Sequence, residues 1–423
     1  MQKFRPLVLG LALSTVFSAM PLHAEEAEKE LLPLEELRMF AEVFGRIKSA
    51  YVEPVSDQKL LEDAIRGMVA GLDPHSSYLA ADDFTSLREH TSGRFGGVGI
   101  EVGMKDGMVH VISPIDDSPA ARAGLQAGDL IIKIDDTPVQ GMSLNDAVEL
   151  MRGEIGSSVR ISILRDGKDA PFEVELEREA IKSTSVRSRL LGDSFGYVRI
   201  SEFQANTGSE LAKSIEKITA DKPLKGLVLD LRNNPGGVLQ AAVDVSDAFL
   251  TEGTIVYTEG RVERTELSFD ADPASLIDMD VPIILLINGG SASASEIVAG
   301  ALQDQQRAVI LGTQSFGKGS VQTILPLAGN RGVKITTARY FTPSGRSIQA
   351  QGIEPDVVVE RRVLESADVP EVDQVRERDL AGHLENQDTE DTKLSAQEFR
   401  SDDFQLYQAY SLLKALNIVN AGR

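Results

Sequence analysis

The spacing of hydrophobic residues changes along the chain and divides it into four blocks. In residues 34–90, apolar side chains recur at helical spacing, which predicts a small helical bundle or an arm packed on another domain. Such an arm can also pair protomers. Gly71 and Pro74 interrupt the pattern. The apolar positions that define it are Leu37, Phe40, Val43, Phe44, Ile47, Leu60, Leu61, Ala64, Ile65, Met68 and Val69.

Residues 93–170 change to strands and glycine turns. A glycine loop leads into a first strand, and the alternation predicts further strands at 109–112, 130–134 and 159–164 and a helix at 144–151. This order, with the stretch Ala123-Gly-Leu-Gln-Ala-Gly-Asp129, resembles a PDZ domain. PDZ domains add a peptide as an extra strand and hold its terminal carboxylate on backbone N–H groups of a glycine loop. That loop would be Gly96, Gly97, Val98 and Gly99; the alternative is a glycine-rich turn in an unrelated sandwich.

Residues 185–360 alternate strands with helices. Strands are predicted at 195–200, 225–231, 281–287, 309–312 and 332–341, of which 225–231 is expected to be buried and 281–287 is continuously apolar. Helices are expected at 208–219, 238–249 and 296–305. This alternation predicts an α/β core with parallel strands, whose sites gather at the carboxyl ends of the strands. Two glycine-containing turns, at 232–237 and 288–293, follow two of these strands.

The last block, 361–423, is acid-rich and contains few apolar residues before Phe404. Residues 365–400 are expected to form a linker. Apolar residues in 402–420 then predict an amphipathic helix that either docks on the core or joins protomers, and we favour assembly.

Composition narrows the function classes. The chain has 423 residues, enough for two or three domains, and a formal net charge of −22, which makes nucleic acid an unlikely partner. It contains no cysteine, so thiolate nucleophiles and cysteine-bound metals are excluded, and its 5 histidines are too scattered for a metal cluster. We therefore predict no metal and no cofactor.

The amino terminus is typical of an export signal. Lys3 and Arg5 precede an apolar stretch that is too short and too interrupted for a good membrane span, and Ala24 provides a small residue before Glu25. We predict cleavage after Ala24; an uncleaved anchor is the alternative. A cysteine-free exported protein is typical of a bacterial periplasm.

A run of small hydroxyl residues carries the candidate chemistry. Ser291, Ser293 and Ser295 lie between a predicted strand and a predicted helix, and Lys318 follows between two glycines. A serine nucleophile needs a base, and residues 185–360 contain no histidine, so a Ser-His-Asp arrangement would need a histidine from another domain. Within this block the candidate base is a lysine that is desolvated and neutral. The alternative is a helix cap beside a glycine turn.

Donors for an oxyanion follow from the same turns. The N–H of Ala294, at the start of a helix, and that of Gly236 or Gly237 in the Pro-Gly-Gly turn can stabilise a negative oxygen. The run from Gly312 to Gly319 nearly matches a phosphate-binding loop. However, its last position is glycine instead of the hydroxyl that holds magnesium, which argues against nucleotide binding.

Together these motifs resemble a bacterial carboxyl-terminal processing protease, the tail-specific family of periplasmic PDZ serine peptidases. The matching segments cover about residues 34–360. They are Leu72-Asp-Pro-His-Ser-Ser-Tyr78, the PDZ block, Asn234-Pro-Gly-Gly237, Gly290-Ser-Ala-Ser-Ala-Ser-Glu296, Phe316-Gly-Lys-Gly-Ser-Val-Gln322, Pro343-Ser-Gly-Arg-Ser-Ile348 and Gly352-Ile-Glu-Pro-Asp356.

The resemblance implies specific roles. It makes Ser293 the nucleophile, Lys318 the general base and Gln322 the residue that orients the lysine, a choice among the serines that spacing alone does not make. It also implies a core similar to the crotonase and Clp protease class. Arg152, after the last PDZ helix, is either a contact that couples peptide binding to the site or simply an exposed arginine.

The resemblance also implies partners. Its members act on proteins with loose, apolar carboxyl termini, which here would include cell-envelope proteins such as peptidoglycan-cutting enzymes. Some members need an adaptor, and members assemble through their terminal elements, so we expect a homo-oligomer. Two alternatives come from other classes: a PDZ scaffold on an inactive hydrolase fold, and a crotonase-like enzyme acting on thioesters.

The predicted fold class is therefore mixed α/β with several domains. A PDZ domain is inserted between a helical amino-terminal arm and an α/β peptidase core, and a helical extension follows. The expected boundaries are 1–24 for the signal, 25–92 for the arm, 93–180 for the PDZ domain, 181–360 for the core and 361–423 for the acidic linker and terminal helix.

Overall fold

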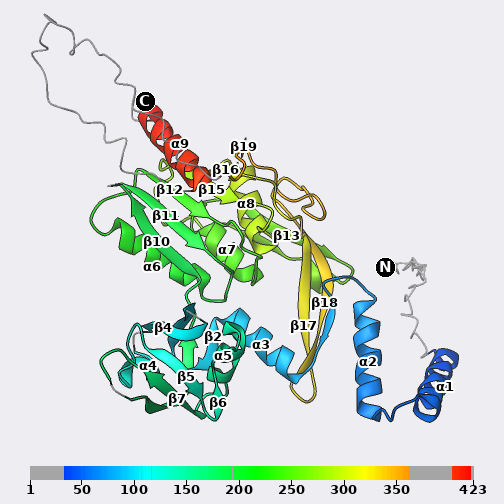
Figure 1. Cartoon of the computed structure of the whole chain (residues 1–423). Coiled ribbons are helices and arrows are strands. Elements are labelled where there is room, and N and C mark those ends of the chain that lie inside the picture. The colour runs from blue at the N-terminus through cyan, green and yellow to red at the C-terminus, as the bar shows by residue number, and fades with distance from the viewer. Residues whose placement is uncertain are drawn as a thin grey trace, which may run out of the picture. The chain divides into compact units, whose positions relative to one another are not determined.

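A computed structural model describes residues 33–362 and 403–420, apart from Asp106, Asp116, Asp169 and Asp193. The expected export signal, its cleavage after Ala24 and the linker at 365–400 lie outside the described residues. The chain divides into two units, residues 1–64 and 65–423, which we describe separately (Figure 1). No helix in the described part is both long and apolar enough to cross a bilayer.

The first unit contains α1 (Leu34–Ala50) and the beginning of α2 (Asp57–Ala70). An ion pair of 2.5 Å joins Lys48 of α1 to Asp57 of α2. No residue of α1 is buried, and its apolar positions are open to solvent, with Phe40 47% and Met39 68% exposed. The helical spacing therefore predicts α1 correctly, but the residues that carry it form no bundle core within the described unit.

The PDZ block forms an antiparallel sheet in which β3 is an edge strand. Inward side chains such as Val109, Ile131 and Ile161 are fully buried in its core. The strand order is β3 (Ile100–Lys105), β4 (Met108–Pro114), β5 (Leu130–Ile134), β7 (Ser158–Leu164) and β8 (Phe172–Glu177), with β6 (Thr137–Pro138) on β5, α4 (Pro119–Arg122) and α5 (Leu144–Met151).

A two-stranded ribbon connects the PDZ block to the rest of the chain. β2 (Arg94–Gly97) enters the block, β9 (Glu179–Lys182) leaves it, and the two strands pair in antiparallel register, Gly96 opposite Ala180. The helix α3 (Ala81–Ser92) precedes the ribbon and ends at Gly93, whose φ of 67° suits the left-handed conformation that ends helices.

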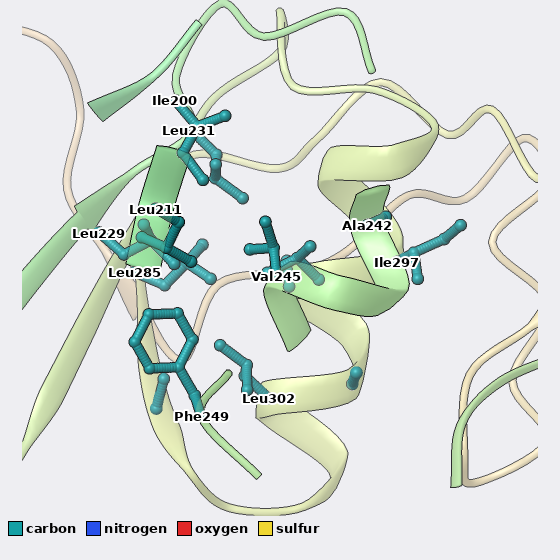
Figure 2. Packing of buried hydrophobic residues seen from close by; sticks show 14 of the residues in the cluster. Ile200, Leu211, Leu229, Leu231, Ala242, Val245, Phe249, Leu285, Ile297 and Leu302 are labelled. Carbon is teal, nitrogen blue, oxygen red and sulfur yellow. The ribbon is translucent and has the colours of Figure 1, made fainter. Parts of the chain in front are cut away.

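The core sheet has parallel central strands covered on both faces. One face packs on three helices, and Figure 2 shows Leu229 and Leu285 meeting Val245 and Phe249 there. The strand order is β10 (Val186–Leu191), β11 (Phe195–Ile200), β12 (Gly226–Asp230), β15 (Ile283–Ile287), β16 (Ala308–Gly312) and β19 (Val357–Val358); the helices are α6 (Thr207–Thr219), α7 (Leu239–Asp247) and α8 (Ala294–Asp304).

The other face of this sheet packs on α9 (Phe404–Asn420). Alternate strand residues point to opposite faces, so Leu227 and Leu229 meet α6–α8, while Val228 packs with Leu413 of α9. Burial on both faces explains the continuous apolar runs. The terminal helix therefore docks on its own chain, the alternative we did not favour, and assembly through it stays a prediction.

A second sheet combines the strand predicted at 332–341, which is β18, with strands that the hydrophobic pattern does not reveal. Its order is β1 (Ser77–Leu79), β18 (Arg331–Phe341), β13 (Thr254–Gly260) and β14 (Ser268–Asp270), and β17 (Ser320–Leu327) also pairs with β18. A short 3-10 turn, η1 (Glu263–Thr265), lies between β13 and β14. The expectation that residues 34–90 are wholly helical is wrong at β1, which pairs with β18 through Ser77 opposite Lys334.

Candidate active site

The serine run lies where β15 ends and α8 begins. Ser291 and Ser295 are fully buried, and their hydroxyls donate to the carbonyls of Leu231 at 2.8 Å and Asn234 at 2.9 Å. Ser293 alone remains partly accessible. The flanking serines therefore tie two strand-end turns together, and the middle hydroxyl is the one that a substrate can reach.

Ser293 occupies a strained backbone conformation. Its φ is 57° and its ψ is −115°, a combination that residues with a side chain rarely adopt. Strain at a sharp strand-to-helix turn is also what exposes the serine in hydrolase nucleophile elbows. The turn thus presents Ser293 in the manner of a nucleophile, although the local sequence lacks the Gly-x-Ser-x-Gly pattern.

The Pro-Gly-Gly turn lies directly against this serine. A Cβ added at Gly236 would come within 2.7 Å of the Ser293 Cβ and 3.0 Å of the Ala294 nitrogen. Gly236 has φ 101° and Gly237 has φ 143°, and at Gly237 a side chain would also collide with the Phe203 carbonyl at 2.1 Å. Glycine is therefore required here both by conformation and by close approach.

Two backbone donors at this point have no acceptor within the part of the chain that the structure describes. They are the N–H groups of Ala294 and Gly237. The N–H of Gly236 instead donates to the side chain of Asn234 at 2.9 Å, and that side chain also donates to the carbonyl of Ile200 at 2.9 Å. Of the three predicted oxyanion residues, Ala294 and Gly237 thus have a free N–H, and Gly236 shapes the turn.

Glu296 connects the serine turn, residues 288–293, to the lysine loop, residues 313–319. Its carboxylate is fully buried and accepts the N–H groups of Ser293 at 2.8 Å and Lys318 at 2.9 Å. The other oxygen accepts the N–H of Gly317 at 2.6 Å and the hydroxyl of Ser315 at 2.5 Å. Four donors compensate the desolvation of this buried anion and fix both candidate residues to one group.

Lys318 is desolvated. Burial lowers the pKa of Lys318 below its ordinary value, and the positive charge of Lys334 lowers it further, whereas Asp73 and Glu296 act in the opposite direction. Its carbonyl accepts the hydroxyl of Tyr340. A lowered pKa increases the neutral fraction that can act as a base.

The candidate dyad is adjacent but not hydrogen-bonded. Within the described residues, the Lys318 ammonium makes no hydrogen bond to Ser293 or Gln322, and the hydroxyl of Ser293 lies within hydrogen-bonding reach of the Tyr340 phenol. Burial raises the pKa of that phenol well above its ordinary value, so it stays neutral. Catalytic hydrogen bonds commonly tighten only when substrate binds.

Gln322 lies on β17, close to the lysine in sequence but turned toward β18. Its side-chain amide donates to the hydroxyls of Ser320 at 2.9 Å and Thr336 at 3.4 Å. The predicted role of Gln322 in orienting Lys318 is therefore not represented by a direct hydrogen bond in this structure and stays a prediction.

The PDZ residues lie apart from this cluster. Gly96 and Gly97 belong to β2, while the N–H groups of Val98 and Gly99 have no acceptor in the described chain. Arg152 is exposed at the end of α5 and stacks over the Phe95 ring, 4.5 Å from its centroid. The described hydrogen bonds include none between Arg152 and either the proposed oxyanion turn or the lysine loop. The coupling role of Arg152 therefore stays a prediction.

Sequence reasoning missed Glu296 and Asn234. The signal for Glu296 was available, because Ser293-Ala-Ser-Glu296 has the Ser-x-x-Glu spacing of a capping box, in which the glutamate accepts the N–H of the cap residue. A second sign of a structural role for Glu296 is that the neighbouring residues at the start of this helix are small or apolar. No local pattern identifies Asn234, since its partners come from distant strands.

We predict that Glu296→Gln destabilises the fold. The amide has one acceptor oxygen where the carboxylate has two, so at least two of the four donors lose their partner, which costs about 2–5 kcal/mol. The urea midpoint followed by circular dichroism measures this loss. Glu216→Gln, at an exposed glutamate of α6, is the matched control and should change stability by less than about 0.5 kcal/mol. Equal midpoints for both variants would contradict the assigned role.

Comparison with known proteins identifies the family. Peptidase family S41 matches residues 194–359, a PDZ domain matches 110–165, and the N-terminal domain of the activating protease CtpB matches 14–83. These ranges cover the core, most of the PDZ sheet and the amino-terminal helices.

Relatives match over most of the chain. A carboxy-terminal-processing protease of Bartonella bacilliformis is 49% identical over 388 residues, which cover 90% of this chain and 88% of the relative. The corresponding protease of Synechocystis is 38% identical, with 76% and 77% covered. The solved photosystem II D1 C-terminal processing protease is 33% identical with a TM-score of 0.46, covering 78% of this chain and 94% of that one. This chain belongs to the carboxy-terminal processing serine proteases of peptidase family S41.

Proposed function

We propose that this protease is a periplasmic endopeptidase with a Ser293–Lys318 site, oriented by Gln322, that cleaves proteins from or near their carboxyl termini. The observation that carries the proposal is the isolation of Ser293. It is the one accessible hydroxyl of its run, stands on a strained turn beside two free N–H groups, and is tied through Glu296 to the loop of a desolvated lysine.

The chemistry follows from these positions. Neutral Lys318 takes the proton of Ser293 as the hydroxyl attacks the scissile carbonyl, and the N–H groups of Ala294 and Gly237 stabilise the oxyanion. The lysine ammonium then protonates the leaving amine, and the acyl-enzyme is hydrolysed by water with Lys318 as base again. The described hydrogen bonds include none between the Lys318 ammonium and the Ser293 hydroxyl, so the proton transfer requires the lysine side chain to turn toward the serine.

The PDZ sheet supports recognition of a substrate tail. β3 is the edge strand of its sheet, so an extended peptide can pair with it, and the free N–H groups of Val98 and Gly99 can hold a terminal carboxylate. Half-buried Ile100 and Val148 lie on β3 and α5, the two elements that border such a groove. An apolar last residue is therefore the expected ligand, and Arg152 is the proposed coupling contact.

Location and substrates extend the same proposal. The export signal predicted at 1–24 would place the enzyme in the periplasm, where peptidoglycan-cutting enzymes and other envelope proteins are the proposed substrates. The match to the N-terminal domain of CtpB, an activating protease, supports a role for a partner at the amino-terminal helices. Membership in the S41 serine proteases argues against the two alternatives considered from the sequence, a PDZ scaffold without activity and a thioester enzyme, and the first experiment below tests them directly.

We predict that Ser293→Ala and Lys318→Ala each lower the cleavage of dye-labelled casein, an unfolded protein, by at least about 1000-fold. Ser214→Ala and Lys213→Ala on α6 are matched controls and should retain activity. A scaffold would keep its cellular function in the Ser293→Ala variant, and a thioester enzyme would bind acyl-CoA. Persistent cleavage by either site variant would overturn the mechanism.

The pH profile of the wild-type enzyme tests the base separately. Only neutral Lys318 accepts a proton, so activity should rise with pH. Because burial lowers the pKa of Lys318 from its ordinary 10.5, the rise should be centred below that value.

We predict that the groove recognises a free, apolar carboxyl terminus. Val148→Asp places a charge in the groove and should raise KM for a substrate with an apolar tail by about 10-fold or more, a loss of about 1.4 kcal/mol, with little change in kcat. Amidation of the substrate terminus should have the same effect. Glu149→Gln, exposed on the same helix, is the control. If amidated and free tails are cleaved with equal KM, the tail proposal fails.

We predict self-association through the amino-terminal helix. The exposed apolar positions of α1 are Leu34, Leu37, Met39, Phe40, Val43 and Ile47, and burying them between two copies removes this surface from water. Sedimentation velocity at micromolar concentration should show an oligomer that Phe40→Glu weakens and Glu42→Gln leaves intact. A wild-type monomer would contradict assembly by any route.

A further inference from the structure

The segment from Asp73 to Leu79 pairs with the second sheet and contributes a negative charge that acts on Lys318. Its strand β1 pairs with β18, with Ser77 opposite Lys334. The N–H of Thr336, two residues further along β18, donates to the hydroxyl of Ser76 at 3.2 Å. The amino-terminal segment is therefore built into the sheet that carries Gln322.

Asp73 is fixed by its own turn. One carboxylate oxygen accepts the N–H groups of His75 at 2.8 Å and Ser76 at 2.9 Å, and the other accepts the Ser76 hydroxyl at 2.7 Å. The hydrogen bond from the Ser76 hydroxyl lowers the pKa of Asp73 most, and the two N–H groups and the Thr336 side chain lower it further. Burial acts in the opposite direction. The carboxylate is thus ionised at neutral pH and has one defined position.

Thr336 connects this turn to Gln322. Its backbone N–H meets Ser76, and its hydroxyl accepts the side-chain amide of Gln322 at 3.4 Å. Gln322 and Thr336 are also directly opposite in the β17–β18 register, and Lys334 lies two positions from Thr336 on the same face. A continuous set of contacts therefore runs from Asp73 through Ser76 and Thr336 to Gln322.

The charges around Lys318 come from three other elements. Lys334 on β18 is positive, whereas Asp73 before β1 and Glu296 on α8 are negative, and all three act on Lys318. Tyr340 of β18 contributes a neutral phenol that donates to the Lys318 carbonyl. Glu296 is occupied by four donors, so Asp73 and Lys334 are the opposed pair that can vary without breaking the serine turn.

We propose that Asp73 is a positioning residue of the active site: through Ser76 and Thr336 it holds Gln322, and its negative charge, opposed by that of Lys334, acts on the Lys318 ammonium. This inference rests on the proposed Ser293–Lys318 site. It gives the Asp-Pro-His-Ser-Ser motif a role in the chemistry instead of in the helical arm.

The test compares variants that differ in the sign of the charge they remove. kcat and KM for dye-labelled casein are measured from about pH 6 to pH 10 in the wild type, Asp73→Asn and Lys334→Gln. Removing the negative charge disfavours the ammonium, so the acid limb of the Asp73→Asn profile should move to lower pH. Removing the positive charge should move the Lys334→Gln limb to higher pH.

Further variants separate charge from position. Thr336→Val removes the hydroxyl that accepts Gln322 but no charge, so kcat should fall by about 10-fold to 100-fold with the midpoint of the acid limb unchanged. Asp82→Asn on α3 and Lys213→Gln on α6 carry the same charge changes at exposed positions and should reproduce the wild-type profile. A purely structural role for the segment would lower activity without moving the two acid limbs in opposite directions.

Each outcome decides one of the two proposals. If Ser293→Ala or Lys318→Ala remains active, the proposed site itself fails. If both are inactive, but the Asp73→Asn and Lys334→Gln limbs coincide with the wild type or move in the same direction, only the role of Asp73 is overturned. Should Asp73→Asn fail to fold, the direction of the Lys334→Gln shift decides, because that variant keeps the Asp73 carboxylate and its donors.

Discussion

The buried carboxylate of Glu296 is the constraint on which the rest of the site depends. Ser293 lies between β15 of the core sheet and α8, and Lys318 lies on the loop before β17 of the second sheet, so nothing in the local sequence aligns the two residues. Four hydrogen bonds to one anion bring them to the same point. A buried carboxylate without hydrogen-bond partners is costly, so the four donors are what allow Glu296 to occupy this interior. The strained backbone of Ser293 is held in the same way, since its N–H is one of those donors.

Among the residues that the structure describes, the Lys318 ammonium has no hydrogen-bond or ion-pair partner. A salt bridge would fix the ammonium and raise its pKa, which would remove the base. Instead, the negative groups that act on it, Asp73 and Glu296, are engaged with N–H and hydroxyl donors of their own, and Lys334 opposes them. The lysine is therefore buried and influenced by charge, but its ammonium remains available to turn toward Ser293.

The sequence predicts the sandwiched core well, but of the second sheet it predicts only β18, for a physical reason. Strands such as β12 and β15 are buried on both faces, so their apolar runs are continuous and their bounds are recovered within a few residues. β17 is half exposed and has no strict alternation, and β1 is a three-residue strand that only its partner β18 defines. At the site, periodicity finds the turns, whereas the choice of Ser293 needs either family resemblance or the burial of Ser291 and Ser295.

The short segment formed by Phe203 and Gln204 contacts both the proposed oxyanion turn at 234–237 and the start of the β2–β9 ribbon. Phe203 accepts the N–H of Val238 at 2.8 Å and donates to the carbonyl of Gly236 at 2.9 Å, which fixes Gly237 between them. The next residue, Gln204, donates to Ser183 at 2.7 Å, and the N–H of Ser183 donates to Gly93 at 3.0 Å, where β2 begins. A side chain at Gly93 would collide with Gln204 at 2.4 Å, so this junction is closely packed. A displacement of the ribbon is therefore transmitted first to residues 203–204. The position of the Gly237 N–H depends on the packing of these two residues.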